Sequence, residues 1–318
     1  MDKQTINTIK RDQTVRGQFA VKSKRAPITY AKGWRFEMVV GDSTGSIPLK
    51  YWGGQDEQRV RDVYNAVKEG GVIEVEARVN EFNDKLELSI GENNYFAVLN
   101  EGEYDPASFL PRTKKDIGQM WSQLKAIIDS IKDPTLAKIV NETYNPSFVE
   151  RFKKAPAAMH IHHAWIGGLL EHTLSIATLC EQTLKTYPSL NRDLLLAGAL
   201  LHDSAKLDEF SVGTTIKVTP MNILVGHLVT GSSNLLAHRG KPGIDDNTLL
   251  KLTHMIVSHH GSKDLGSPKI PAFPEAIVLS TMDQMDCSMV RTIKLMDEAD
   301  NDAVDTYDPK EERTIYLK

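Results

Sequence analysis

Hydrophobic and polar residues alternate along the first 90 residues with the period of two that half-buried β-strands show. Residues 13–24 begin the alternation, and residues 35–40 and 46–52 continue it on either side of a turn rich in glycine and aspartate. Residues 71–82 and 85–90 alternate again, after a segment whose valines and tyrosine share one helical face. The pattern predicts three strands, one helix and two further strands.

This order of elements is that of an OB-fold barrel, a small closed β-sheet that commonly binds single-stranded nucleic acid. We therefore predict an all-β OB-fold domain over residues 1–100. Residues 101–115 show no periodicity and contain Pro106 and Pro111, so we predict a linker there.

From Asp116 onwards the hydrophobic residues recur at intervals of three and four, as in amphipathic helices. Asp116 stands directly before the first of these runs, where an N-cap is expected. The sequence predicts an all-α domain over residues 116–318 that ends in an acidic tail. The tail packs either on this domain or on a second copy of the chain in a homo-oligomer. The predicted helices span residues 116–131, 134–144, 147–153, 162–186, 191–206, 221–239, 246–260 and 273–296.

The composition is that of an ordinary globular protein, with 41% hydrophobic and 25% charged residues in a chain of 318, which is long enough for two cores. No apolar run approaches the roughly 20 residues that cross a bilayer, so we expect no membrane segment. The N-terminus lacks the apolar core of a secretory signal, and the only cysteines are Cys180 and Cys287. These features favour a cytoplasmic protein.

The formal net charge of −4 argues against a protein that coats nucleic acid by overall charge, but the basic residues are unevenly placed. Eight lysines and arginines lie between Lys10 and Arg35, against one acid. Aromatic residues stand near them, and a positive surface with aromatic rings suits a single strand. A place in the barrel core is the alternative for each aromatic residue taken singly. We predict substrate contacts from Arg16, Lys24, Trp34 and Tyr51.

His202 and Asp203 are adjacent at the end of the run LLLAGALL, which is apolar enough to be a buried helix. An imidazole and a carboxylate side by side on a rigid element can bind one divalent ion or bridge two. Taken alone, the pair is better explained as a polar helix end. Further histidines and aspartates recur at helix-compatible intervals, namely His172, His227, His259, His260, Asp283 and Asp286.

The chain resembles the HD-domain metal-dependent phosphohydrolases in a series of ordered motifs: HHAWIGGLLEHT, AGALLHDSAK, GHL, SHHG, and PEA followed by DxxD. In their fuller form these strings are similar to those of the YhaM-type 3'-to-5' exoribonucleases. The similarity runs through nearly the whole chain, and five motifs in order are far more specific than any one of them.

The resemblance implies a metal centre built from side chains of several helices. Asp203 would be the carboxylate that bridges two ions. Asp283 is preferred to Asp286 because the first aspartate of the pair corresponds in the family, although sequence alone does not separate residues one helical turn apart. The implied ligands are His172, His202, Asp203 and Asp283 for the minimal site, and His227, His259 and His260 for a second ion.

Two residues near these motifs also have a functional interpretation. Lys206 can offer an ammonium group to a phosphate oxygen or to the leaving group, or it can simply complement a helix dipole. We predict Lys206, with Asp203, as catalytic. His163 follows His160 and His162 in the string HIHHA, and we predict that it lines the phosphate pocket, with a structural role as the alternative.

The chain departs from the family at two positions. Ala205 replaces the glycine of the usual HDxGK string, and Gly168 stands where some two-metal relatives place a glutamate one turn before the first ligand histidine. Glu171, next to His172, would point elsewhere on a helix. We therefore expect the second ion site to be weaker or differently built.

A centre of histidines and carboxylates suits Mn, Fe, Co, Ni or Zn better than Mg, and the resemblance favours Mn. The predicted function is a metal-dependent 3'-to-5' exoribonuclease that hydrolyses single-stranded RNA to nucleoside monophosphates, with DNA left open as a substrate. One alternative is an HD-type phosphohydrolase of free nucleotides or cyclic dinucleotides. The other is a non-catalytic protein that binds single-stranded nucleic acid. No GxGxxG or GxxxxGK[ST] string supports a dinucleotide or P-loop site.

Overall fold

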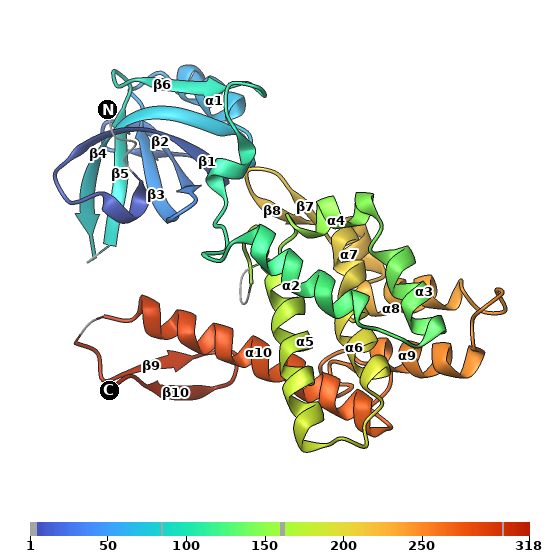
Figure 1. Cartoon of the computed structure of the whole chain (residues 1–318). Helices are drawn as coiled ribbons and strands as arrows, with labels where there is room; N and C mark the ends of the chain where they lie inside the picture. The colour runs from blue at the N-terminus through green and yellow to red at the C-terminus, as the bar shows by residue number, and fades with distance from the viewer. Residues whose placement is uncertain (1–4, 84, 160–162, 301) are drawn as a thin grey trace. The chain divides into compact units, whose positions relative to one another are not determined.

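The computed structural model describes residues 5–83, 85–159, 163–300 and 302–318, which form two compact units (Figure 1). The first unit comprises residues 1–112 and 212–217, and the second comprises residues 113–211 and 218–318. Each unit has a hydrophobic core of its own. The prediction of an OB-like β-barrel followed by a helical domain is confirmed. The predicted limits of the two domains stay predictions. Residue 162, where a helix was expected to begin, lies outside the described residues, and so does His160.

The barrel of the first unit is closed by its long first strand. β1 (Thr14–Tyr30) pairs through its first half with β4 (Val72–Phe82) and through its second half with β2 (Gly33–Asp42). β3 (Gly45–Trp52) pairs with β2, and a parallel pairing of β3 with β5 (Lys85–Gly91) leads back to β4. The strands therefore follow one another around the barrel in the order β1, β2, β3, β5 and β4.

Alternate side chains of these strands fill the barrel. β1 changes register after Val21 and again after Arg25, and such bulges bend a strand enough to pair with two neighbours. α1 (Glu57–Ala66) begins at Asp56, whose carboxylate accepts the N–H of Arg59, and it adds Val60 to the core. The largest core side chains include Phe19, Phe36, Leu49, Tyr51, Ile73, Leu88 and Ile90.

Two segments after the barrel were not predicted. β6 (Phe96–Leu99) pairs antiparallel with β4, although a run of this length is too short to show a period. Within the predicted linker, the 3₁₀ turn η2 (Pro106–Phe109) buries Phe109 against Ala20 and Val72 of the barrel. The linker therefore begins as a packed extension of the first unit.

The second unit is organised around α6 (Arg192–Leu201), in which every residue from 194 to 201 is buried. α6 packs against α2, α3, α5, α9 and α10, as Figure 1 shows. The expected cap is present, because Asp116 accepts the N–H of Gln119 at the start of α2. Apart from α6 and the short α7 described below, the helices seen in the described part of this unit are α2 (Ile117–Asp129), α3 (Pro134–Thr143), α4 (Pro146–Phe152), α5 (Gly168–Thr186), α8 (His227–Leu236), α9 (Asp246–Ser258) and α10 (Pro274–Glu298).

Two predicted helices are interrupted. The helix expected over residues 191–206 ends at Leu201 and continues as the 3₁₀ turn η3 (Ser204–Asp208). The helix expected over residues 221–239 is split into α7 (Pro220–Leu224) and α8, because Gly226 adopts a positive φ of 80° between them. The split makes His227 the first residue of α8.

A short hairpin of β7 (Phe210–Val212) and β8 (Ile216–Val218) separates η3 from α7. Its tip belongs to the first unit, where the hydroxyl of Thr214 donates to the carbonyl of Gly70 at 2.6 Å. The sequence contains no alternating run here long enough to predict this hairpin.

The acidic tail also forms a hairpin, with strands β9 (Asp305–Asp308) and β10 (Arg313–Tyr316). Arg291 of α10 donates to Asp308 at 2.9 Å and pairs with Glu311 at 2.8 Å. The tail therefore packs on a helix of its own unit. Among the described residues, no helix is both long enough and apolar enough to span a membrane.

Candidate metal centre

The centre lies where α6 ends. Asn191 caps the start of this helix by accepting the N–H of Leu194. The leucines and alanines that follow are buried on all sides of the helix. After Leu201 the chain tightens into η3, and the side chains of His202 and Asp203 are almost completely buried there. A histidine and a carboxylate are thus held at the rigid end of a fully packed helix.

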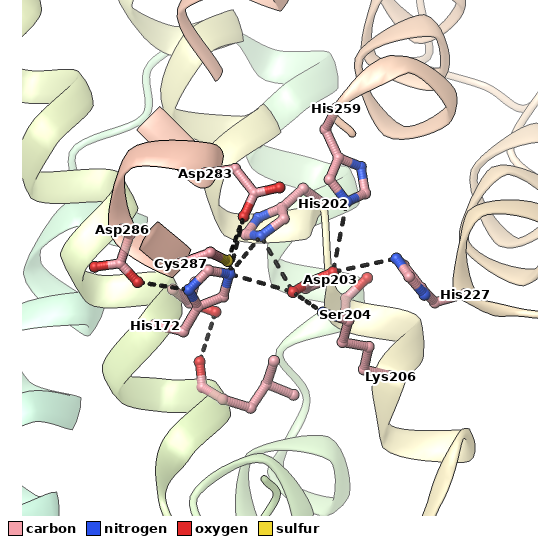
Figure 2. Close-up of polar contacts among 12 residues, drawn as sticks. His172, His202, Asp203, Ser204, Lys206, His227, His259, Asp283, Asp286 and Cys287 are labelled. Atoms are coloured by element: carbon pink, nitrogen blue, oxygen red, sulfur yellow. Dashed lines mark hydrogen bonds and ion pairs between the residues drawn. The ribbon is translucent and has the colours of Figure 1, made fainter. Parts of the chain in front are cut away.

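One oxygen of Asp203, Oδ2, faces two histidines (Figure 2). Nε2 of His172, from α5, and Nε2 of His202 each lie 3.3 Å from this oxygen and 3.3 Å from one another. Oδ1 of Asp283, from α10, lies 3.4 Å from Nε2 of His172. Three helices therefore bring together the four residues implied for the minimal site.

The other oxygen of Asp203, Oδ1, faces a second group of histidines. Nε2 of His227 lies 3.4 Å from it and Nε2 of His259 lies 3.6 Å from it. Nε2 of His260 is 3.3 Å from Nε2 of His227. Asp203 thus stands between two groups of possible ligand atoms with one oxygen toward each, as a bridging carboxylate would.

Three of these histidines are oriented by backbone carbonyls. Nδ1 of His202 donates to Ala199 at 2.8 Å, and Nδ1 of His259 donates to Ile256 at 2.7 Å. In His260 the same nitrogen donates to the carbonyl of Leu265 at 3.0 Å. A carbonyl can only accept, so the proton of each neutral ring must be on Nδ1.

The other two histidines are oriented by carboxylates. Nδ1 of His172 donates to Asp286 at 2.8 Å, and Nδ1 of His227 donates to Glu209 at 3.1 Å. In all five rings Nε2 is therefore the nitrogen turned toward the centre. Metal-binding histidines in proteins are held in this way, with one nitrogen on the ion and the other on a hydrogen-bond acceptor.

Atoms at the centre fit a cation. Among the described residues, neither oxygen of Asp203 takes part in a hydrogen bond of good geometry, and neither does Nε2 of His259, although these atoms are buried. Burial alone would raise the pKa of Asp203, but the charges of Lys206, whose Nζ is 2.7 Å from Oδ2, and of His202 hold this pKa well below its ordinary value. The carboxylate is therefore ionised, as a metal ligand must be.

The histidines complete the fit. Burial lowers the pKa of His259, and burial together with His259 lowers the pKa of His260 to about 4, so both rings are neutral at pH 7. Burial also lowers the pKa of His172, but the carboxylates of Asp203, Asp283 and Asp286 outweigh it and raise this pKa well above its ordinary value. So many carboxylates around one imidazole leave negative charge that a divalent cation would offset.

Asp283 and Asp286 lie on opposite sides of His172. Asp283 faces Nε2, whereas Asp286 accepts from Nδ1 and also from Nε2 of His163 at 2.9 Å and from the hydroxyl of Ser175. His163 is buried behind His172, away from the atoms that face Asp203. The contact with Asp286 is what a structural role for His163 requires, and the place predicted for it in a phosphate pocket stays a prediction.

The start of α5 explains the departure at Gly168. A Cβ on this residue would lie 2.0 Å from the backbone oxygen of His163, so only glycine fits. Gly167 before it adopts a positive φ of 83°. Glu171 points away from the centre, as expected, and is held by the Thr113 hydroxyl at 2.7 Å, the Trp165 indole at 2.9 Å and Lys115 at 3.0 Å.

The sequence patterns did not indicate Glu209. This residue follows η3, is buried, and accepts the backbone N–H of His227 as well as its Nδ1. The only sequence signal is an acid close after the HD pair. A second contact that was not predicted is that of Cys287, whose thiol donates to Asp283 at 3.5 Å. Burial raises the pKa of Cys287 to about 12, so it remains a thiol.

Two of the barrel residues predicted to contact substrate have other roles. Tyr51 points into the core and stacks on Phe36 with ring centroids 4.9 Å apart, so it takes the place in the barrel core that was the alternative to its predicted contact with substrate. It points inward because it has the same parity as the buried Leu49 on β3. Lys24 lies over the ring of Tyr64 and donates to the carbonyls of Tyr64 and Val67 at 2.8 and 2.6 Å, so it tethers α1.

The other two predicted barrel residues are only partly available. Arg16 pairs with Glu74 at 3.2 Å and lies over the ring of Tyr95. Trp34 is half-buried and packs against the barrel core, with Arg61 over its ring.

A different set of basic and aromatic side chains lies on the outside of the sheet. The rings of Tyr30 and Trp52 meet edge to face at 4.9 Å, and the guanidinium of Arg35 lies 5.2 Å from the Trp52 ring. Arg35 lies opposite Ile28 of β1 and opposite Trp52 of β3 in the sheet. The side chains of Ile28, Arg35 and Trp52 therefore lie on the same, outer face of the sheet. We call this set the outer-face cluster, and it comprises Arg25, Tyr30, Arg35, Lys50, Trp52 and Phe82.

Comparison with known proteins agrees with this geometry. Residues 169–302 match the family model described as HD domain. The 3'-5' exoribonuclease YhaM of Geobacillus sp. (strain WCH70) is 30% identical to the chain over 253 residues, which cover 79% of this chain and 75% of that protein. The YhaM of Bacillus subtilis (strain 168) is 29% identical, with 82% and 80% covered, and that of Shouchella clausii (strain KSM-K16) is 27% identical, with 90% and 86% covered. The chain therefore belongs to the YhaM exoribonuclease family, whose HD domain makes it a metal-dependent hydrolase.

Proposed function

We propose that this protein is a 3'-to-5' exoribonuclease that releases nucleoside monophosphates from single-stranded RNA. The observation that carries the proposal is the position of Asp203, with one oxygen toward each group of Nε2 atoms, in a chain whose relatives are named 3'-5' exoribonucleases. The outer-face cluster supports the choice of substrate, because aromatic rings flanked by cations bind the bases and phosphates of a single strand.

The residues of the centre have separate tasks in this proposal. A pair of divalent ions in such a site supplies an activated water and neutralises the charge of the phosphodiester. Asp203 would hold both ions, and the Nδ1 hydrogen bonds would keep the histidines from rotating away from them. Burial lowers the pKa of Lys206, but Asp203 outweighs it and raises this pKa, so Lys206 keeps its proton and can donate it in a hydrogen bond to a phosphate oxygen.

We propose Mn²⁺ as the preferred ion. The centre offers five imidazole nitrogens and the carboxylates of Asp203 and Asp283, a mixture that suits Mn, Fe, Co, Ni or Zn better than Mg. Activity with each chloride salt in turn, added to metal-free protein, ranks the ions. A ranking with Mg²⁺ first would contradict this choice.

The activity is tested with a single-stranded RNA labelled at its 5' end, incubated with the protein and Mn²⁺. We expect a ladder of labelled fragments that shorten from the 3' end, together with nucleoside monophosphates. An RNA that stays intact, or that is shortened only from its 5' end, would refute the proposal. DNA of the same sequence, free nucleotides and a cyclic dinucleotide are tested in parallel, and hydrolysis of the last two alone would favour the phosphohydrolase alternative.

We expect Trp52→Ala to weaken the binding of single-stranded RNA by roughly 10-fold, because stacking on one aromatic ring contributes about 1–3 kcal/mol per base. The matched control is Tyr95→Ala, which removes a more exposed ring that lies beside Arg16 and is not part of the outer-face cluster. Binding is measured by fluorescence anisotropy with a labelled RNA. If Tyr95→Ala weakens binding and Trp52→Ala does not, the strand binds on the Arg16 side of the barrel instead.

A further inference from the structure

Of the five histidines of the centre, His172 and His227 alone are seen, within the described residues, to donate Nδ1 to a carboxylate. The other three donate Nδ1 to backbone carbonyls. These two rings approach different oxygens of Asp203, since His172 faces Oδ2 and His227 faces Oδ1. Each group of Nε2 atoms therefore contains one ring with a negative charge behind it.

Asp286 and Glu209 are both placed to support a histidine and not to bind an ion themselves. Asp286 uses Oδ2 for His172, as Figure 2 shows, and also for His163, and it uses Oδ1 for Ser175, so both of its oxygens already accept hydrogen bonds. Glu209 accepts both the backbone N–H and Nδ1 of His227. Both carboxylates are buried, so water does not screen their charge.

We infer that Asp286 and Glu209 are positioning residues, one for each ion. Asp286 sets the affinity for the ion beside His172, His202 and Asp283, and Glu209 sets the affinity for the ion beside His227, His259 and His260. This inference rests on the two-ion centre of the proposed function. Its physical basis is that a carboxylate behind an imidazole fixes the ring and makes the opposite nitrogen a stronger donor to a cation, and the loss of such a partner typically weakens metal binding 10–100-fold.

The test replaces each carboxylate by the amide of the same shape. Asp286→Asn and Glu209→Gln remove the charge but leave an oxygen that can accept from Nδ1. Metal-free full-length protein is titrated with MnCl₂, and bound Mn²⁺ is followed by calorimetry and by the electron paramagnetic resonance of the free ion. We expect the wild type to bind two ions, and each variant to keep one at the wild-type affinity and to bind the other roughly 10–100-fold more weakly.

A second set of variants assigns each carboxylate to its ion. Asp283→Asn removes a ligand beside His172, and His260→Ala removes one beside His227. In the Asp283→Asn background the ion that remains should be weakened by Glu209→Gln and left almost unchanged by Asp286→Asn. In the His260→Ala background the ion that remains should be weakened by Asp286→Asn and left almost unchanged by Glu209→Gln. The reason is that two substitutions at the same ion site affect one another, whereas substitutions at different sites act independently.

The control is Asp208→Asn, which neutralises an exposed acid next to Glu209, and it should bind both ions like the wild type. Thermal melting in the presence of a chelator shows which variants fold. Asp286 and Glu209 lie in different parts of the second unit, so if one variant does not fold, the other can still refute the inference. It is overturned if a folded variant binds both ions with the wild-type affinity, if Asp286→Asn weakens the ion that remains in Asp283→Asn, or if the wild type binds a single ion. These readouts do not involve RNA, so they remain decisive even if the protein fails to hydrolyse RNA.

Discussion

Replacing Asp203 by asparagine is expected to reduce RNA hydrolysis by on the order of 1000-fold, which corresponds to about 4 kcal/mol of lost transition-state stabilisation. The amide keeps the shape of the side chain but loses the negative charge and one of the two oxygens that face Nε2 atoms. Both ions should therefore bind more weakly. Single-turnover rates at saturating RNA and the Mn²⁺ content of the purified protein measure the two effects.

Asp208→Asn is the matched control, because it makes the same chemical change in the same turn, on a side chain that is half exposed and pairs with Arg151 at 2.7 Å. It should retain activity within about twofold of the wild type, since an exposed ion pair contributes little. If Asp203→Asn hydrolysed RNA as fast as Asp208→Asn, the metal centre would not be the active site.

Removing divalent ions with a chelator is expected to abolish hydrolysis and to lower the melting temperature of the second unit by roughly 5–10 °C. The expected change in melting temperature follows from an ion present at about 100 times its dissociation constant, which stabilises the folded state by about 2.7 kcal/mol. Without cations, the buried carboxylates of Asp203 and Asp283 depend on the Lys206 ammonium and on the neighbouring imidazoles to offset their negative charge. Calorimetric melting with and without EDTA, followed by addition of MnCl₂, measures the loss and the recovery.

The Asp203→Asn variant again serves as the comparison, because its melting temperature should respond much less to EDTA than that of the wild type. The melting of the barrel unit should not change, since the possible ligand atoms described above all lie in the second unit. Full hydrolysis after exhaustive chelation would contradict the metal-dependent mechanism.

The elements of the barrel could be predicted because strand alternation is a local property. The same alternation also indicates that Tyr51 points into the barrel, but the prediction of substrate contacts did not use it. Ile47, Leu49 and Tyr51 have one parity and are buried, whereas Lys50 and Trp52 have the other and lie on the outer face. The basic residues near the start of the chain favoured Lys24 as a substrate contact. Only the folded chain shows that the carbonyls of Tyr64 and Val67 accept hydrogen bonds from its ammonium group.

The metal centre could be predicted from the order of its motifs, but the supports of its histidines could not. Asp283 and Asp286 are one turn apart on α10, and only the folded chain shows that they face different nitrogens of His172. The partners of His202, His259 and His260 are backbone carbonyls, which every residue has, so the sequence contains no sign of them. Glu209 reaches His227 because Gly226 breaks the helix between α7 and α8.

The contact between Gly168 and the backbone of His163 limits how this centre can change during evolution. A glutamate at position 168 does not fit the present backbone, because its Cβ would lie 2.0 Å from the backbone oxygen of His163. The preceding segment would have to move first, and that would carry His163 away from Asp286. Position 168 is therefore closed to a further ligand, and the histidines beside Oδ1 of Asp203 depend instead on supports such as Glu209 behind His227.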